Sequence, residues 1–335
     1  MQQNYLPGEA ISTIYLGGGT PSLLEPEELE LILDRLRGLF TIRPDAEYTL
    51  EANPDDINPA KLAAWKQAGI NRLSIGIQSF FEEDLQWMNR AHNAQQAEAC
   101  ILLAQEAGFH NLTIDLIYGT PGLTDARWQE NVQKALALGV PHLSCYALTV
   151  EPGTALQKMI AQHKKEAVDD EKQARHFTLL MQWMQEAGYE HYEISNFARP
   201  GFRSRHNTSY WQGVPYLGLG PSAHSFNGAA RQWNIANNAL YIQSLQNDKV
   251  PFEAEQLNAA QRLNEYIMIS LRTAEGIDLR RLEKEFGTEA LNAVEGSLQP
   301  YLQSNKCVID EERIILTKEG KFFADGIAAG LFVEG

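Results

Sequence analysis

Residues 12–26 read STIYLGGGTPSLLEP and lie close to the start of a chain of 335 residues. The first five form a short apolar run with the composition of a β-strand, and three glycines, Thr20 and Pro21 follow directly. Glycines immediately after a strand allow the backbone to approach a ligand closely, because no Cβ intervenes. The stretch therefore predicts a ligand-binding loop at the end of a strand; a tight strand-to-helix turn without a ligand is the plainer alternative.

The same rhythm of strand, turn and helix continues through the first half of the chain. Strand-like runs cover residues 13–16, 48–50, 73–77, 112–118 and 143–148, and helical stretches include 27–40, 59–68, 94–107 and 126–138. Alternation of this kind predicts an α/β fold with parallel strands, whose ligands bind at the carboxyl ends of the strands. Five strands are too few to close an eight-stranded barrel, so we expect an open or partial barrel.

The rhythm stops near residue 150, which predicts a change of architecture. We expect a barrel domain at 1–150, an extension rich in aromatic residues and glycine at 151–250, and a small C-terminal domain at 251–335. The last of these reads as helices followed by a hairpin around CVIDEERIILTKEG, a succession typical of a winged helix. With the acidic balance of the chain, we expect this domain to be a structural module and not a DNA reader.

Composition limits the compartment and the partners. The chain carries 28 basic and 43 acidic side chains, a formal net charge of −15, which argues against nucleic acid or an anionic membrane as a partner. The first residues lack the basic start and apolar centre of a signal peptide, and no apolar run reaches the length of a membrane span. The three cysteines, Cys100, Cys145 and Cys307, are far apart and suit buried thiols in a reducing compartment. We therefore expect a cytoplasmic protein.

Polar residues follow the strand-like runs where a ligand would bind. Glu51 and Gln78 end two of the runs, Arg90 follows a short helix, and Asp115 interrupts the apolar run of LTIDLIYG. A second Gly-Thr-Pro turn, residues 119–121, follows that last strand. A charged residue in a buried strand is costly unless it is paired. Together these groups offer acceptors for ammonium and ribose hydroxyl groups and a cation for a carboxylate, which predicts a ligand that is part amino acid and part nucleoside.

An ordered set of motifs resembles the HemW family. The motifs are YLGGGTPSLL, EANPDDI, GINRLSIGIQSF, MNRAH, TIDLIYGTPG, YALTVEPGTAL, YEISNFARPG, RHNTSYW and YLGLGPSAHSF. HemW proteins are radical S-adenosylmethionine (SAM) proteins related to the oxygen-independent coproporphyrinogen III oxidase HemN, and they are regarded as haem chaperones. The resemblance implies a six-stranded partial barrel, a [4Fe-4S] cluster and bound SAM. It places SAM contacts at Gly18, Gly19, Thr20, Glu51, Gln78, Arg90 and Asp115.

The resemblance also implies a cluster motif that this chain does not contain. The family holds its cluster by three cysteines in C-x-x-x-C-x-x-C, on the loop after the first barrel strand. We therefore expect a truncated (β/α)6 barrel that lacks its first βα unit, and no iron–sulfur ligands in this chain. Cys100 falls in a helical stretch, Cys145 in a strand and Cys307 in the tail, so these thiols do not replace the motif. Without a cluster we expect no radical chemistry from this chain.

Residues 205–211, RHNTSYW, carry the H-N-x-x-Y pattern of HemW members: His206, Asn207 and Tyr210. Histidine is a common axial ligand of haem iron, which makes His206 the best candidate for that role. By the same reasoning Trp211 would supply flat apolar surface, and Arg203 and Arg205 would pair with the propionates. His224 is a second candidate ligand, whereas His191 is expected to pack and His92 to cap a helix. The bland alternative is a loop histidine bonded to backbone.

Several functions remain open on the sequence alone. The main hypothesis is a haem chaperone that binds haem and passes it to an acceptor protein. The first alternative is a coproporphyrinogen III oxidase-like enzyme of porphyrin biosynthesis. The second is a cluster-less protein that binds SAM or haem, and the third is a non-functional fragment. Loss of haem binding in His206→Ala would favour the chaperone, and tight SAM binding without iron would favour the cluster-less protein.

Overall fold

The computed structural model describes residues 1–6, 8 and 10–334 and divides the chain into two compact units. The barrel unit comprises residues 12–38 and 42–204, and the tail unit comprises residues 1–11, 39–41 and 205–335. Each unit is described by itself below. None of the described helices combines the length and the apolarity that a bilayer crossing needs.

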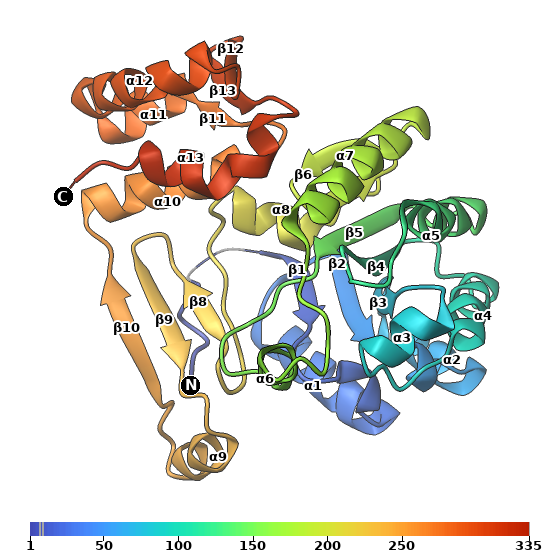
Figure 1. The fold of residues 1–335 in the computed structure, drawn as a ribbon. Coiled ribbons are helices and arrows are strands. Elements are labelled where there is room, and N and C mark those ends of the chain that lie inside the picture. The colour runs from blue at the N-terminus through green and yellow to red at the C-terminus, as the bar shows by residue number, and fades with distance from the viewer. Residues whose placement is uncertain (7, 9, 335) are drawn as a thin grey trace. The chain divides into compact units, whose positions relative to one another are not determined.

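The barrel unit is built on a curled seven-stranded sheet with the order β1-β2-β3-β4-β5-β7-β6 (Figure 1). Neighbours from β2 to β5 pair in parallel, and β7 and β6 add an antiparallel edge. The strands are β1 (Ile11–Leu16), β2 (Ile42–Ala52), β3 (Arg72–Gln78), β4 (Leu112–Tyr118), β5 (His142–Ala147), β6 (Glu190–Glu193) and β7 (Asn196–Ala198). The predicted α/β partial barrel is thereby confirmed.

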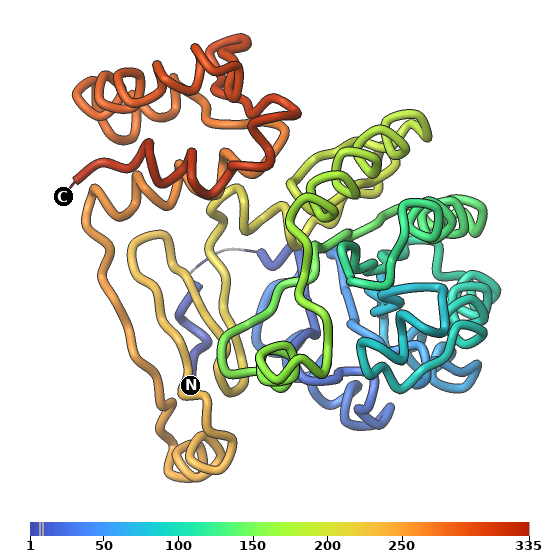
Figure 2. The backbone as a smooth tube through the Cα atoms, viewed as in Figure 1, coloured from blue at the N-terminus to red at the C-terminus, as the bar shows by residue number. Residues whose placement is uncertain are grey.

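Helices cover the outer face of this sheet, and the backbone in Figure 2 returns through a helix between successive parallel strands. They are α1 (Pro26–Leu39), α2 (Pro59–Ala68), α3 (Glu82–Trp87), α4 (Ala94–Glu106), α5 (Asp125–Ala137) and α7 (Asp170–Glu186). The short helix α6 (Ala155–Ala161) buries none of its residues. Two short 3-10 turns, η1 (Pro21–Leu23) and η2 (Pro54–Asp56), follow β1 and β2. Side-chain caps fix several starts; Asn93 and Gln96, for example, form a capping box at α4.

Strand periodicity decides which residues enter the core. In β4, Leu112, Ile114 and Leu116 are fully buried in one hydrophobic cluster with Trp65 of α2 and Trp128 of α5. Successive strand residues point to opposite faces, so the residues between them face the concave side. The concave face therefore receives the polar residues of each strand.

The tail unit contains two three-stranded sheets and a helical subdomain. Its strands are β8 (His224–Phe226), β9 (Ala230–Asn234), β10 (Phe252–Gln256), β11 (Ile277–Asp278), β12 (Cys307–Asp310) and β13 (Arg313–Leu316). Its helices are α8 (Arg205–Trp211), α9 (Asn238–Gln246), α10 (Ala259–Leu271), α11 (Leu279–Phe286), α12 (Thr288–Gln303) and α13 (Ala324–Gly330), with a 3-10 turn η3 (Gly320–Phe323). Strands β12 and β13 form the hairpin predicted for the winged-helix-like module.

Candidate functional site

A row of polar side chains runs across the concave face of the barrel sheet. Glu51 on β2 is paired in register with Ser74 on β3, and Asp115 on β4 is paired with Ser144 on β5. Paired residues of parallel strands share a face. Leu50 and Ala52 of β2 lie in the hydrophobic cluster behind the sheet, so Glu51 faces the other way. The two acidic residues predicted at the strand ends thus lie on one face.

Glu51 joins the glycine loop to the sheet. Its carboxylate accepts a hydrogen bond from the Tyr15 hydroxyl at 2.6 Å and another from the Gly18 backbone N–H at 3.1 Å. Gly18 and Gly19 have φ values of +75° and +65°, a region that favours glycine. A Cβ at Gly17 would lie 3.0 Å from the Glu51 carboxylate and closer still to the Tyr15 ring. The glycines therefore let this loop fold down onto Glu51.

Gln78 and Arg90 converge on the end of β3. A Cβ at Gly76 would lie 2.9 Å from Gln78 Nε2 and 3.3 Å from Arg90 Nη2, so glycine leaves room for both side chains. Arg90 donates to Asn53 Oδ1 at 3.1 Å, which links it to the segment that follows Glu51. Gln78 has a φ of +65°, unusual for a residue with a side chain, at a register shift between β3 and β4. This bend turns Gln78 out of the strand alternation.

His92 supports that bend in a way the sequence did not predict. Its ring Nε2 lies 3.0 Å from the carbonyl of Ile77, the residue before Gln78, and the ring is 3% exposed. With that carbonyl as acceptor, Nε2 carries the proton. Burial lowers the pKa of His92, so the ring stays neutral at pH 7. His92 therefore bonds a strand carbonyl and does not cap a helix.

Asp115 carries the most perturbed carboxyl group of this edge. Burial, followed by repulsion from Glu51, raises its pKa to about 7, although a hydrogen bond with Ser144 and the charge of Arg90 act in the opposite direction. Two carboxylates that share one low-dielectric face favour a cation between them. Burial and Glu51 likewise raise the pKa of the Tyr15 hydroxyl, which therefore stays a donor. The edge is suited to a ligand that is positively charged on one side.

The structure thus brings Gly18, Glu51, Gln78, Arg90 and Asp115 together, and Gly19 and Thr20 follow Gly18 in the same loop. A Cβ at Gly19 would meet nothing within 4 Å, and the Thr20 carbonyl accepts the N–H of Leu23. Sequence reasoning missed three members of this edge: Tyr15, Asn53 and Tyr146. Tyr146 shares the concave face with Ser144 on β5 and is 43% exposed. Only their positions, beside the glycine loop, Glu51 and the end of β5, could have indicated them.

The candidate haem residues lie on α8 of the tail unit. His206 Nε2 lies 3.0 Å from the Tyr210 hydroxyl, one helical turn away, and the two rings meet edge to face at 4.8 Å. Tyr210 continues to Tyr216, with ring centroids 4.7 Å apart. Burial lowers the pKa of His206 to about 4, so its imidazole is neutral at pH 7 and has a lone pair for a metal. Trp211 is engaged by Arg272, whose guanidinium lies 5.5 Å from its ring.

The remaining predicted residues have other surroundings. His191 stacks on Phe197 at 4.1 Å and packs as expected. His224 is exposed on β8, and its ring lies 6.3 Å from that of Trp233. Arg203 forms an ion pair with Glu190 at 2.8 Å within the barrel unit, so its guanidinium is already matched. Asn207 lies on α8 beside His206.

Comparisons with known proteins identify the family. The profile of the radical SAM superfamily matches residues 3–148, and that of the HemN C-terminal domain matches residues 257–323. The "Heme chaperone HemW" of Mycobacterium tuberculosis is 36% identical over 97% of this chain and 82% of its own length. The chain belongs to the HemW family. The HemW of Bacillus subtilis is 30% identical over 97% of this chain and 86% of its own length.

A solved structure shows the same fold for this HemW family member. The coproporphyrinogen III oxidase HemN from Escherichia coli, described as a radical SAM enzyme, aligns over 97% of this chain and 79% of its own, with a TM-score of 0.83. Its sequence identity to this chain is 23%. The comparison therefore establishes the architecture, and the chemistry has to be argued from the residues.

The iron–sulfur cluster of radical SAM proteins can be tested against the thiols present. Cys100, Cys145 and Cys307 are each free and buried, on α4, β5 and β12 respectively. Within residues 1–6, 8 and 10–334, no three His, Cys, Asp or Glu side chains gather as a metal site would require. Burial raises the pKa of all three thiols, the opposite of what a thiolate ligand needs. These three cysteines do not fit an iron–sulfur cluster.

Proposed function

We propose that this protein is a haem chaperone that binds haem through α8 and passes it to an acceptor protein. The observation that carries the proposal is the pair His206 and Tyr210, which presents a neutral imidazole in a protein of the HemW family. A chaperone must hold its cargo firmly enough to carry it and release it to a better ligand. One histidine whose Nε2 exchanges between Tyr210 and iron meets both needs.

The aromatic surroundings of His206 favour a flat, apolar cargo. Tyr210, which is 38% exposed, and Tyr216 place two ring edges beside the imidazole. Burial raises the pKa of Tyr210 to about 12, so its hydroxyl is a donor and not an anionic ligand at neutral pH. Iron binding would therefore replace the His206–Tyr210 hydrogen bond, and the Tyr210 hydroxyl would turn to solvent or to a porphyrin substituent.

We propose SAM as the ligand of the carboxyl edge of the barrel sheet. Glu51 and Asp115 would face its cationic side, Arg90 its carboxylate, and the N–H groups of the glycine loop its polar atoms. SAM in this superfamily supplies a cleavable sulfonium when a reduced cluster accompanies it. The residues described here bind and orient such a ligand, and Asp115 holds or releases a proton near pH 7.

Haem binding is tested by titrating purified protein with hemin and following the Soret band. We expect a saturable, one-to-one spectrum of histidine-ligated haem for the unmodified protein and its loss in His206→Ala. His224→Ala is the matched control, because it removes a histidine from the same unit and should bind as the unmodified protein does. Equal hemin uptake by His206→Ala would remove His206 as the ligand, and loss in both variants would show that His206 is not the sole histidine required.

A second assay separates the chaperone from the two enzyme-like alternatives. SAM is titrated by calorimetry into protein purified without oxygen, and coproporphyrinogen III is incubated anaerobically with the same protein, iron and sulfide, SAM and a reductant. We expect SAM binding and no decarboxylated porphyrinogen. SAM binding without any hemin binding would favour the cluster-less SAM protein. A decarboxylated porphyrinogen would favour the coproporphyrinogen III oxidase-like enzyme, and binding of neither SAM nor hemin would favour a non-functional fragment.

A further inference from the structure

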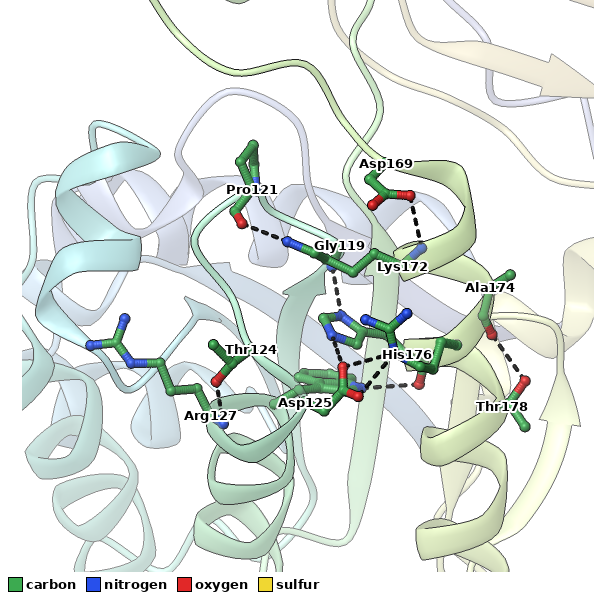
Figure 3. Close-up of polar contacts among 12 residues, drawn as sticks. Gly119, Pro121, Thr124, Asp125, Arg127, Asp169, Lys172, Ala174, His176 and Thr178 are labelled. Carbon is green, nitrogen blue, oxygen red and sulfur yellow. Dashed lines mark hydrogen bonds and ion pairs between the residues drawn. The ribbon is translucent and has the colours of Figure 1, made fainter.

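Helix α7 reaches both turns that leave β4 and β5 at the carboxyl edge of the barrel sheet. Lys172 donates to the carbonyl of Pro121 at 2.5 Å, and Gln173 donates to the carbonyl of Leu148 at 2.7 Å. One turn further along α7, His176 accepts the backbone N–H of Gly119 at 3.2 Å. Figure 3 shows Lys172 and His176 pointing from the helix to the two ends of the 119–121 turn.

Within the 119–121 turn the Thr120 carbonyl accepts the N–H of Leu123 at 3.1 Å, whereas the Gly119 N–H and the Pro121 carbonyl at its two ends bond to α7. Gly119 has a φ of +76°, and a Cβ there would come within 2.3 Å of Gln173. The Thr120 side chain is 2% exposed, and its hydroxyl has no hydrogen-bond partner among the described residues. A buried hydroxyl without a partner costs free energy and does not hold the turn. The two ends of the turn are therefore held by α7.

The tautomer of His176 follows from its two neighbours. Nδ1 receives the Gly119 N–H, so it carries no proton, and Nε2 donates to Asp125 Oδ1 at 3.1 Å. Asp125 is held in turn by both oxygens in an ion pair with Arg175, at 2.9 and 3.1 Å. The His176 ring is fully buried, and Trp128 donates to the His176 carbonyl. Asp125, on α5, thus orients the ring so that its acceptor nitrogen faces Gly119.

We propose that His176 is a positioning residue for the carboxyl-edge ligand site, acting through Gly119, with Lys172 and Gln173 completing a clamp on the exits of β4 and β5. Asp115 lies on β4, and Ser144 and Tyr146 lie on β5, so the clamp sets the spacing of the strand ends that carry them. The part of this inference that concerns affinity rests on the proposed SAM site. The part that concerns the clamp stands on the contacts alone.

Two substitutions separate the two bonds of the ring. The side-chain amide of Asn places its oxygen near the position of Nδ1, whereas the amide of Gln reaches the position of Nε2. His176→Asn therefore keeps an acceptor for Gly119, and His176→Gln keeps a donor to Asp125. Both variants remove one bond and leave a similar space, so a merely structural histidine predicts the same defect in each.

The clamp is tested by hydrogen exchange of the peptide that contains residues 118–123, without any ligand. We expect exchange at Gly119 to be about tenfold faster in His176→Gln and within about threefold of the unmodified protein in His176→Asn. Equal exchange in the two variants, whether both fast or both slow, would overturn the clamp. Thermal unfolding of each variant is recorded alongside to show that it folds. Lys172→Met removes the second contact of α7 with the same turn and should also speed exchange at the turn, so it replaces a histidine variant that does not fold.

The link to the ligand is tested by calorimetry with SAM on the same proteins. We expect the Kd to rise about fivefold or more in His176→Gln and to change less than twofold in His176→Asn. A weaker SAM affinity in both, or in neither, would overturn His176 as a positioning residue. If the unmodified protein binds no SAM, the proposed SAM site fails, and the exchange experiment still decides whether the clamp exists.

Discussion

Each end of the barrel sheet carries a cluster of polar side chains, and the two clusters differ in burial and in hydrogen bonding. At the amino ends of the strands, Arg72, Thr113, His142 and Tyr192 are all at most 4% exposed. Arg72 donates to Asn111, to Thr113 and to the carbonyl of Phe202, and His142 Nε2 lies 2.7 Å from the Tyr192 hydroxyl. The polar groups at this end bond to one another, and solvent is excluded from this cluster, called the sealed cluster below.

At the carboxyl ends of the same strands the polar groups are left partly exposed and incompletely matched. Glu51, Gln78, Arg90 and Asp115 all retain accessible surface. Burial and, after it, repulsion from Glu51 raise the pKa of Asp115. The same sheet therefore contains polar residues that hold the fold and polar residues that suit the proposed ligand. The former are buried and hydrogen-bonded to one another, except for His142 Nδ1, which has no partner among the described residues, and the latter carry a cost that a bound molecule would relieve.

The largest effect is expected from removing the centre of the sealed cluster. Arg72→Met should lower the free energy of unfolding by about 3–5 kcal/mol, because it leaves the buried Glu47 carboxylate without its neighbouring cation. Urea unfolding followed by circular dichroism measures it. Arg43→Met is the matched control, since Arg43 pairs with Asp45 in solvent and its loss should cost less than about 1 kcal/mol. Similar losses in both variants would contradict the distinction between the two ends.

At the carboxyl edge, removing a charge is expected to raise the free energy of unfolding and not to lower it. Because the folded pKa of Asp115 is raised from 3.8 to about 7, its carboxyl favours folding only where it is protonated, and ionisation makes the folded state costly as pH rises. Asp115→Asn should therefore stabilise the protein by about 1–3 kcal/mol at pH 8, with the gain shrinking toward pH 4. The same variant should weaken SAM binding. Destabilisation at pH 8 would show that Asp115 is a structural group like those of the sealed end.

The strands of the sheet were easier to predict from the sequence than the polar clusters at its two ends. The strands β3, β4 and β5 were predicted within one or two residues of their ends. Strands that helices cover are rich in hydrophobic residues, so they can be recognised as apolar runs in the sequence. The first half of β2 was missed, since Arg43, Pro44 and Asp45 do not read as a strand. The strand β7 was missed because it is only three residues long within an aromatic, loop-like region.

The two polar clusters were unequally visible for a physical reason. Asp115 stands out in the sequence because a charge interrupts an apolar strand, and Gln78 and Glu51 because they end one. Arg72 and His142 look like ordinary polar residues at strand starts, and only packing reveals that they are buried together. The clamp of α7 is invisible for the same reason: His176 is separated from Gly119 by 57 positions, and nothing local to either residue indicates their hydrogen bond.

A smaller effect is expected on the pH dependence of stability, through His142 in the sealed cluster. Burial, assisted by the charge of Arg72, holds the pKa of His142 well below its ordinary value. A group with a lowered folded pKa contributes stability above the unfolded value of about 6.5, and that stability is lost as pH falls below it. His142 alone should lower the free energy of unfolding by about 1 kcal/mol between pH 6.5 and 5.5, in addition to the falls from His92 and His206, and His142→Gln should remove this contribution. His110→Gln, which alters an exposed histidine, should leave the pH dependence of stability unchanged.

The last comparison makes one substitution, tyrosine to phenylalanine, at each end of the sheet. Tyr192→Phe removes the partner of His142 Nε2 inside the sealed cluster, so it should cost about 1–3 kcal/mol of stability and leave SAM affinity unchanged. Tyr15→Phe removes the 2.6 Å bond to Glu51 at the partly exposed edge, where water can replace the hydroxyl. It should cost less than about 1 kcal/mol and weaken SAM binding about threefold. If the two variants exchanged these profiles, the carboxyl edge would be the structural end of the sheet and the ligand would have to be sought at Arg72.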